Sequence, residues 1–219
     1  MRVLGIIPCR YNSSRFPGKP LADILGKSMV QRVYEKSSLC NNLNKVIVAT
    51  DDERICFHVK SFGGNVMMTS KTHESGTERC AEILEKIIEN FDVIVNIQGD
   101  EPFIEPSQIS QLISLFDKEN VKIATLAKKV ENYTTLTDEN KVKIFFDKEN
   151  NANSFVRNYE ITEEKFHKEN FYKHIGIYAF RSDVLEKITK LSASKSEKDL
   201  NLEQLRWLDN KFKIKVEIT

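Results

Sequence analysis

Several signatures of familiar protein classes are missing from this sequence of 219 residues. Its four cysteines, Cys9, Cys40, Cys56 and Cys80, form no C-x-x-C pair, and its four histidines follow no zinc-ligand spacing. A disulfide framework or a zinc site is therefore not indicated. We expect reduced and mostly buried thiols.

Long apolar runs and a charge imbalance are also absent. No stretch approaches the ~18 apolar residues of a membrane span, and MRVLGIIPCR is too short an apolar run for a signal peptide. We therefore expect a cytoplasmic protein with no membrane partner. With 33 basic and 32 acidic residues the net charge is +1, so no nucleic-acid partner is indicated and any charge-based function must be local.

The glycine-rich phosphate loops are missing as well. There is no G-x-x-x-x-G-K-[ST] loop and no G-x-G-x-x-G fingerprint, so a dinucleotide cofactor is unsupported. No Ser/His/Asp or Cys/His arrangement can be argued from spacing.

Apolar strands and amphipathic helices alternate instead. In the first half we expect strands at 2–8, 45–51, 63–69 and 92–100, and helices at 28–39, 53–62, 75–91 and 106–116. The helix at 75–91 carries an apolar stripe that includes Ile87 and Ile88, with Ser75 or Thr77 as its cap. In the second half we expect strands at 122–130, 141–147, 170–181 and 212–219, helices at 182–191 and 198–210, and a mobile loop across 150–170.

This alternation predicts an α/β chain with a doubly wound, mostly parallel sheet flanked by helices. Such sheets bind ligands at the carboxyl ends of their strands, and polar clusters follow three of them, at Arg10, Asp51 and Gln98. We expect a single domain over 1–219, with a small subdomain inserted at about 130–180.

The cluster RYNSSRFPGKP, residues 10–20, suits an anion such as a nucleotide phosphate. Arginine forks and a lysine charge hold phosphates, with hydroxyl groups and loop N–H groups beside them. A solvated basic loop is the alternative.

Three further clusters have both a functional and a structural interpretation. NIQGDEP, residues 96–102, places two carboxylates at the ligand-binding edge of the sheet, where they would suit Mg²⁺. Alternatively, the same pair only caps a helix. HESGTER, residues 73–79, precedes a helix N-terminus that favours anionic ligands, or is a cap alone. KHIGIY and LEQLR, residues 173–178 and 202–206, are polar groups among core-like residues, or simply a strand and an amphipathic helix.

In order, the motifs P-x-R-Y-x-S-x-R-x-P-G-K-P-L, A-T-D, H-x-S-G-T-E-R, N-x-Q-G-D-E-P, K-H-I-G-I-Y and L-E-Q-L-R resemble the 3-deoxy-manno-octulosonate (Kdo) cytidylyltransferases, across residues 3–216. The resemblance implies a Rossmann-like nucleotidyltransferase fold, a homodimer, and the reaction CTP + Kdo → CMP-Kdo + diphosphate in lipopolysaccharide biosynthesis. It implies in-line attack of the sugar's anomeric hydroxyl on the α-phosphorus.

The resemblance also implies the site. Arg10, Lys19 and Asp100 would be catalytic, and Asp100 would hold Mg²⁺. The nucleotide-binding residues would be Arg10, Ser13, Ser14, Arg15, Lys19, Ser75, Gly76, Thr77, Arg79 and Gln98. The sugar-binding residues would be Gln98, Arg157, His174, Tyr178, Glu203 and Gln204.

Two departures from the family pattern leave alternatives open. The family pattern continues into a G-x-D-T-P-E-D segment whose aspartate is expected to be a second metal ligand, and this sequence ends at Thr219, before that segment. We therefore expect that the sequence is truncated, that the metal ligand is lost, or that a partner supplies it. The stretch after Arg157 lacks an S-x-I-P character. The alternative functions are transfer to 8-amino-8-deoxy-Kdo or another sugar acid, and nucleotide binding without turnover.

Overall fold

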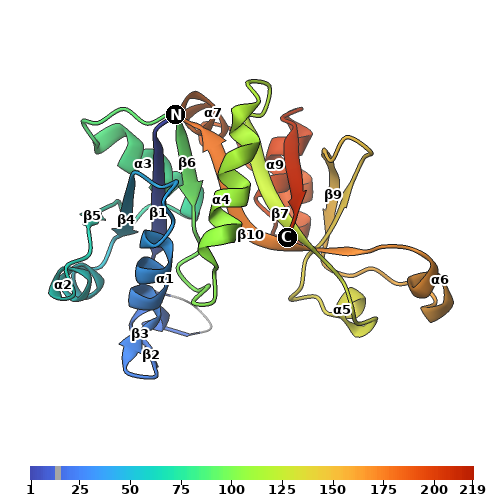
Figure 1. Cartoon of the computed structure of the whole chain (residues 1–219), viewed down its shortest axis with the longest axis horizontal. Coiled ribbons are helices and arrows are strands. Elements are labelled where there is room, and N and C mark those ends of the chain that lie inside the picture. The colour runs from blue at the N-terminus through green and yellow to red at the C-terminus, as the bar shows by residue number, and fades with distance from the viewer. Residues whose placement is uncertain (13–15) are drawn as a thin grey trace. The chain divides into compact units, whose positions relative to one another are not determined.

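The computed structural model describes residues 1–12 and 16–219 (Figure 1). The chain divides into two compact units. Unit 1 comprises Met1–Ser114 and Ile177–Thr189, and unit 2 comprises Leu115–Gly176 and Lys190–Thr219. Strand β10 (Tyr172–Arg181) begins in unit 2 and ends in unit 1.

Unit 1 is built on parallel strands in the order β6, β1, β4 and β5, with the end of β10 antiparallel to β6. The strands are β1 (Val3–Cys9), β4 (Lys45–Thr50), β5 (Val66–Met68) and β6 (Val93–Asn96). Strands β1, β4 and β6 are almost wholly buried, as continuous apolar runs in a parallel sheet should be. They form the core of this unit.

In the described residues of unit 1, five α-helices follow the strands. They are α1 (Met29–Ser38), α2 (Glu53–Ser61), α3 (Gly76–Lys86), α4 (Pro106–Ser114) and α7 (Ser182–Ile188). Helix α1 packs against α4, and α3 packs against α7. A 3₁₀ turn η1 (Lys19–Leu21) and a small hairpin, β2 (Asp23–Ile24) with β3 (Lys27–Ser28), precede α1.

Unit 2 contains the parallel pair β7 (Ile123–Lys129) and β11 (Ile214–Ile218), with β7 beside β10. Strand β8 (Lys143–Phe146) pairs antiparallel with β9 (Ala152–Val156) and with the start of β10. Its helical segments are η2 (Leu115–Asp117), α5 (Thr134–Thr137), α6 (Glu163–Lys168), α8 (Lys195–Leu200) and α9 (Gln204–Asp209).

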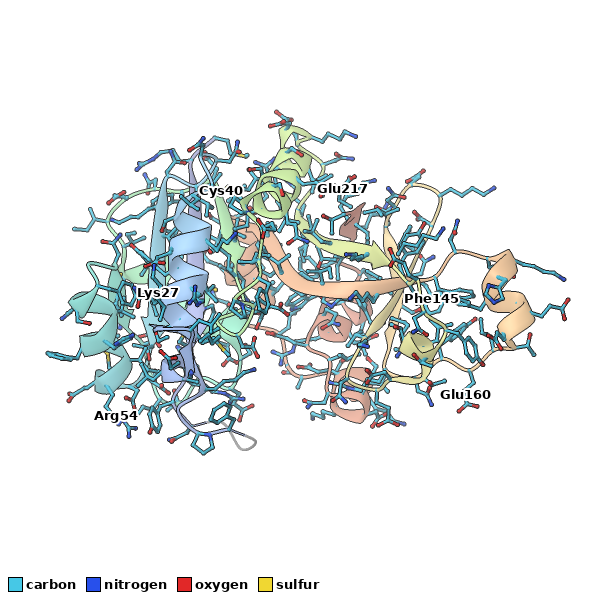
Figure 2. The ribbon with its side chains drawn as sticks, turned by 60° about the horizontal axis from the view of Figure 1, so that its bottom comes forward. Lys27, Cys40, Arg54, Phe145, Glu160 and Glu217 are labelled. Carbon is cyan, nitrogen blue, oxygen red and sulfur yellow. The ribbon has the colours of Figure 1, made fainter. Side chains whose placement is uncertain are left out.

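A second, smaller hydrophobic cluster lies within unit 2. Val130, Leu136 and Phe171 are buried in it, and aromatic side chains pack around them. The rings of Phe145 and Tyr159 lie 4.8 Å apart between centroids (Phe145 is labelled in Figure 2). Aromatic packing of this kind stabilises a segment with few long elements.

The expected elements of the first half are confirmed, but the third helix is shorter than predicted. It ends at Lys86, and Ile88 is 99% exposed instead of lying in the apolar stripe. The carboxylate of Glu89 accepts hydrogen bonds from Arg2 and Lys45, so the segment after Lys86 is held at the starts of β1 and β4. These tertiary contacts compete with continuation of the helix.

Two expectations for the second half are wrong. The helix predicted at 198–210 is two helices, α8 and α9, because Asn201 adopts a left-handed conformation with φ of 52° and ends the first. The segment 150–170, predicted as a mobile loop, contains strand β9 and helix α6. Three cysteines, Cys9, Cys40 and Cys80, are buried as expected.

Candidate active site

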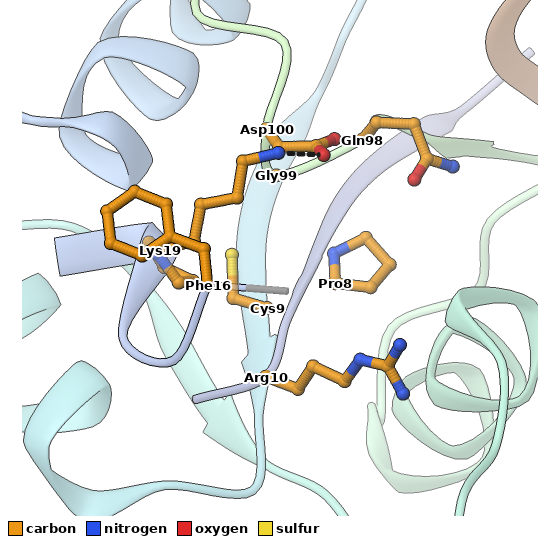
Figure 3. A pocket seen from close by; sticks show the side chains of 9 residues that line it. Pro8, Cys9, Arg10, Phe16, Lys19, Gln98, Gly99 and Asp100 are labelled. Atoms are coloured by element: carbon orange, nitrogen blue, oxygen red, sulfur yellow. Dashed lines mark hydrogen bonds and ion pairs between the residues drawn. The ribbon is translucent and has the colours of Figure 1, made fainter. Parts of the chain in front are cut away.

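A cavity of about 580 Å³ opens in unit 1 where β1 and β6 end (Figure 3). Strands β1 and β6 are parallel, so their carboxyl ends reach the same edge of the sheet. The cavity is lined by Pro8, Cys9, Arg10, Phe16, Lys19, Pro20, Gln98, Gly99 and Asp100. The structure thus brings together four of the predicted site residues, Arg10, Lys19, Gln98 and Asp100.

An ion pair crosses this cavity between the two predicted motifs. Lys19 Nζ donates to Asp100 Oδ2 at 2.5 Å, as the dashed line in Figure 3 shows. The side chains are 34% and 49% exposed, so water screens the pair and it contributes little to stability. Both charged groups therefore remain accessible to a ligand that enters the cavity.

Glycine is required on both sides of the cavity. Gly18 has φ of 73°, and a Cβ there would lie 3.2 Å from the Tyr11 ring. A Cβ on Gly99 would lie 2.5 Å from Cys9 Sγ and 2.7 Å from the carbonyl oxygen of Pro8. Gly99 thus lets the chain after β6 lie directly against the end of β1, which brings Asp100 to the cavity.

The cavity contains a thiol that is unsuited to nucleophilic chemistry. Burial, with a smaller contribution from the Asp100 carboxylate, raises the pKa of Cys9 to about 12. The thiol therefore stays protonated near neutral pH. Its role is to pack beneath Gly99.

Helix α3 begins with the predicted HESGTER motif. Ser75 is the N-cap: its Oγ accepts from the Glu78 N–H at 3.2 Å, and the Glu78 carboxylate accepts from the Ser75 N–H at 3.3 Å. This reciprocal capping box orients the first turn, which starts with Gly76 and the buried Thr77. Of the two predicted caps, Ser75 is the one the structure uses.

Arg79, predicted to bind nucleotide, has a buried guanidinium. It donates to Asp51 Oδ2 at 2.9 Å, to Thr69 Oγ1 at 2.8 Å and to the carbonyl oxygen of Ser70 at 3.0 Å. Only 4% of the side chain is exposed. Arg79 therefore joins the end of β4 to the segment that follows β5.

A second hollow of about 350 Å³ lies in unit 1 and shares Arg10 with the first cavity. It is lined by Arg10, Tyr11, Asn12, Asp51, Asp52, Arg54, Lys71, His73 and Arg79. The Arg54 guanidinium lies 3.3 Å from the centroid of the Tyr11 ring, and its hydrogen bond lowers the pKa of Asp52. Cations outnumber carboxylates here, so the two adjoining hollows suit an anionic ligand.

His73 is oriented by a neighbouring carboxylate. Its Nε2 lies 2.5 Å from an oxygen of Glu82. Burial opposes ionisation of Glu82, but hydrogen bonds from Lys86, the Ser70 N–H and His73 outweigh it and lower the pKa of Glu82 to about 2. Glu82 is therefore a permanent anion near neutral pH and holds the imidazole at the rim of the hollow.

The predicted sugar-side residues are divided between the units. In unit 1, Gln98 lines the large cavity, and the buried Tyr178 pairs with Asn96 across β10 and β6. In unit 2, the buried Gln204 begins α9 directly after Glu203.

Arg157, also in unit 2, is engaged by backbone groups. Its guanidinium donates to the carbonyl oxygens of Leu200 at 2.6 Å, Asn201 at 2.9 Å and Glu139 at 3.2 Å. These bonds fix the turn between α8 and α9. The binding of a sugar carboxylate by Arg157 stays a prediction.

His174 is a predicted sugar contact on β10 in unit 2. Its Nε2 lies 2.9 Å from Thr125 Oγ1, and burial of the ring lowers its pKa to about 3. The imidazole is therefore neutral near pH 7. It is a hydrogen-bonding group there, not a charge.

Asp100 is the only predicted metal ligand. No group of three or more His, Cys, Asp or Glu side chains suited to a metal occurs among residues 1–12 and 16–219. Mg²⁺ is commonly held by one or two carboxylates together with substrate phosphates, and the half-exposed Asp100 in a cationic cavity fits that pattern. The predicted residues Ser13, Ser14 and Arg15 lie outside the described part of the chain.

Sequence reasoning missed several parts of the site. Pro8 and Cys9 line the cavity but were not predicted as site residues, and Phe16 was named only as part of the basic cluster 10–20. Asp51 was placed at the ligand-binding edge of the sheet, directly after a buried strand, but its contact with Arg79 was not predicted. Apolar residues that line a cavity cannot be told from other apolar residues in a sequence.

Comparisons with known proteins define the class. The sequence profile of the cytidylyltransferases matches residues 4–214. A solved structure described as CMP:2-keto-3-deoxy-manno-octonic acid synthetase complexed with CTP superposes with a TM-score of 0.92 and 37% identity, covering 100% of this chain and 90% of that one. A 4-diphosphocytidyl-2C-methyl-D-erythritol synthase from Anaerococcus prevotii, at 15% identity and a TM-score of 0.60, shares the fold.

Curated relatives narrow the class further. A 3-deoxy-manno-octulosonate cytidylyltransferase from Parabacteroides distasonis is 51% identical and one from Bacteroides thetaiotaomicron is 49% identical, each over 100% of this chain and 90% of the relative. The chain therefore belongs to the cytidylyltransferase family, and within it to the 3-deoxy-manno-octulosonate cytidylyltransferases. The predicted nucleotidyltransferase fold is confirmed.

Proposed function

We propose that this protein transfers CMP from CTP to 3-deoxy-manno-octulosonate, releasing diphosphate, as a step in lipopolysaccharide biosynthesis. The observation that carries the proposal is the cavity at the ends of β1 and β6, where Arg10, Lys19 and Asp100 lie together in a chain that matches such enzymes over its full length. A cationic cavity with one accessible carboxylate suits a triphosphate with its divalent cation.

The cations of the cavity would bind the triphosphate. Lys19 is a point charge that can move from Asp100 to a phosphate oxygen, because their pairing is exposed and weak. Arg10 lines both hollows of unit 1, so its guanidinium can reach a nucleotide that occupies either. Both side chains would offset the negative charge that the departing diphosphate carries.

Asp100 would hold Mg²⁺ with the phosphates of CTP. When bound, Mg²⁺ would supply neutralisation of phosphate charge at the reacting group. Asp100 would fix the position of the nucleotide relative to Lys19, which lies beside it. In the transfer itself, the anomeric hydroxyl oxygen of the sugar forms a bond to the α-phosphorus, the bond to diphosphate breaks, and the hydroxyl loses its proton.

The sugar would be recognised by neutral hydrogen-bonding groups and by Arg157. In unit 2, the neutral His174 offers a donor and an acceptor for hydroxyl groups. In unit 1, Gln98 lines the cavity proposed for CTP and offers an amide group there. For Arg157 to bind the sugar carboxylate, it would exchange one or more of its three carbonyl partners for the carboxylate. A charged acceptor would favour that exchange.

The direct test is release of diphosphate from CTP and Mg²⁺ by the purified chain, with and without the sugar. We expect release that requires 3-deoxy-manno-octulosonate. A panel with 8-amino-8-deoxy-Kdo and a sialic acid identifies the sugar. Release that is independent of any sugar acid, or its absence despite binding of CTP by calorimetry, would contradict the proposal.

The role of Asp100 is tested by Asp100→Asn, which keeps the shape of the side chain and removes its charge. We expect turnover to fall about 100-fold or more, with an unchanged melting temperature because Asp100 is half-exposed. Asp117→Asn, at an exposed carboxylate of η2, is the matched control and should keep full turnover. A normal rate in Asp100→Asn would refute the metal-binding role.

We infer further that the chain works as a homodimer in the cytoplasm. Its likeness to the family supports both statements. Light scattering of the purified protein should give twice the chain mass of 25.3 kDa. A mass of 25.3 kDa at micromolar concentration would contradict the dimer.

No helix in the described residues is both long enough and apolar enough to span a membrane.

A further inference from the structure

A further basic cavity, separate from the two hollows of unit 1, lies wholly within unit 2, and the proposed function does not use it. Its volume is about 380 Å³, within the range of small-ligand sites. It is lined by Lys118, Asn120, Val121, Lys122, Ile123, Glu149, Asn151, Lys213 and Lys215. These residues come from the start of β7, the start of β11 and the turn between β8 and β9.

Backbone hydrogen bonds fix these three segments to one another. Ile214 on β11 is in register with Ile123 on β7. The turn between β8 and β9 is joined to β11, because the Val216 N–H donates to the Asn150 carbonyl at 2.8 Å and Asn151 forms a bridge with Lys215. The cavity is therefore preformed, which spares a ligand the cost of ordering its walls.

Two pairs of lysines face this cavity from different walls. Lys213 and Lys215 are two residues apart at the start of β11, so their side chains leave the same face of the strand. Lys118 and Lys122 flank a turn in which the Val121 N–H donates to the Lys118 carbonyl at 3.1 Å.

Only one carboxylate, that of Glu149, stands against these four ammonium groups in the lining. It accepts from Asn151 Nδ2 at 3.3 Å, and Lys215 Nζ donates to the Glu149 backbone carbonyl. The nearby carboxylate of Asp147 accepts from the N–H groups of Asn151 and Glu149, which lower its pKa, and the charge of Lys215 lowers that pKa further. Four ammonium groups against these two carboxylates leave an excess of positive charge that a small anion would offset.

We propose that this cavity is a binding site for an anion with two linked phosphate groups, such as diphosphate. Each lysine pair would hold one phosphate group, because ammonium groups bind phosphate as point charges from two sides. The buried Val121 and Ile123 supply the apolar part of its lining. The site is distinct in sequence and in unit from the cavity that contains Lys19 and Asp100.

Amide chemical shifts of the full chain test the site. The diphosphate titration contains neither CTP nor sugar, so its outcome at this site is independent of the proposed function. Sodium diphosphate is titrated at constant ionic strength, with inorganic phosphate and CTP as separate arms. We expect saturable shifts at residues 118–123, 149–151 and 213–215, with diphosphate binding at least ten-fold more tightly than phosphate. Saturable shifts at the same residues with CTP would also support the inference, because CTP carries linked phosphate groups that the cavity would then bind as part of a nucleotide.

A pair of double variants provides the control. Lys122→Gln/Lys213→Gln removes one cation from each wall and should weaken diphosphate binding at these amides at least ten-fold. Lys60→Gln/Lys190→Gln makes the same change in net charge at two exposed lysines outside the cavity and should leave binding unchanged. All four lysines are exposed, so melting temperatures should match that of the wild type.

Several results would overturn the inference. They include shifts that never saturate, equal affinity for phosphate and diphosphate, and equal weakening by the two double variants. Shifts confined to the residues around Lys19 and Asp100 would also overturn it.

Discussion

At the scale of single residues, two buried cations organise backbone segments near the predicted site. Arg79 joins the end of β4 to the chain after β5. In unit 2, Lys143 is 1% exposed, and its Nζ donates to the carbonyl oxygens of Asp138 and Arg157. Burial lowers the pKa of Lys143, and these carbonyl groups replace its lost water. Both cations act first as structural residues in this structure.

Loss of the Arg79 guanidinium is expected to destabilise the protein. Arg79→Met would leave the largely buried Asp51 carboxylate without its cation, and we expect a loss of about 3 kcal/mol in the free energy of unfolding. Urea denaturation measures it.

Arg54→Met is the control for Arg79→Met, because Arg54 also pairs with an aspartate, Asp52, but its side chain is 58% exposed. We expect almost no change in stability for the control. Equal losses in the two variants would show that burial does not set the energy of these pairs.

At the scale of elements, the cap of α3 connects a sequence motif to a measurable energy. Ser75→Ala removes the hydrogen bond to the Glu78 N–H, and we expect a loss of about 1 kcal/mol in stability. Denaturant midpoints of the wild type and variant give the difference.

Ser38→Ala is the control for the cap. The exposed Ser38 lies in the last turn of α1, where its hydroxyl donates to the Tyr34 carbonyl, so its removal should change stability by less than about 0.5 kcal/mol. An equally small change in Ser75→Ala would mean that water replaces the cap.

Local signals explain which elements could be predicted from sequence. The strands of unit 1 are continuous apolar runs, and α3 has both a capping motif and an apolar stripe, so both were recognisable. The end of α3 was not, because the contacts of Glu89 with Arg2 and Lys45 join residues far apart in sequence. The break at Asn201 depends on one left-handed residue that helical periodicity does not register.

The same distinction applies to the candidate site. Arg10, Lys19 and Asp100 follow strands whose direction could be predicted, and they lie together in one cavity. The carbonyl partners of Arg157 could not be predicted, because they depend on the turn between α8 and α9. The charge of a side chain can be read from the sequence. The backbone groups to which that side chain donates hydrogen bonds cannot, because they depend on the fold.

At the scale of the whole molecule, the neutral His174 makes stability depend on pH. Its pKa is about 3 in the folded protein and near the ordinary value of 6.5 in the unfolded chain. Between these values the unfolded chain binds the extra proton, so stability falls as the pH falls below 6.5. The slope is at most about 1.4 kcal/mol per pH unit, and less where water reaches the ring, because the residue is not fully buried.

The measurement is urea denaturation between pH 6.5 and pH 5, a window above the range in which Glu82 and other carboxylates with lowered pKa values take up protons. His174→Gln keeps a polar partner for Thr125 and removes the titration, so its stability should change less with pH than that of the wild type. His167→Gln, at a 70% exposed side chain of α6, should keep the wild-type slope. If His174→Gln also keeps that slope, the imidazole is solvated in solution, and the proposed contribution of a neutral His174 to sugar recognition fails with it.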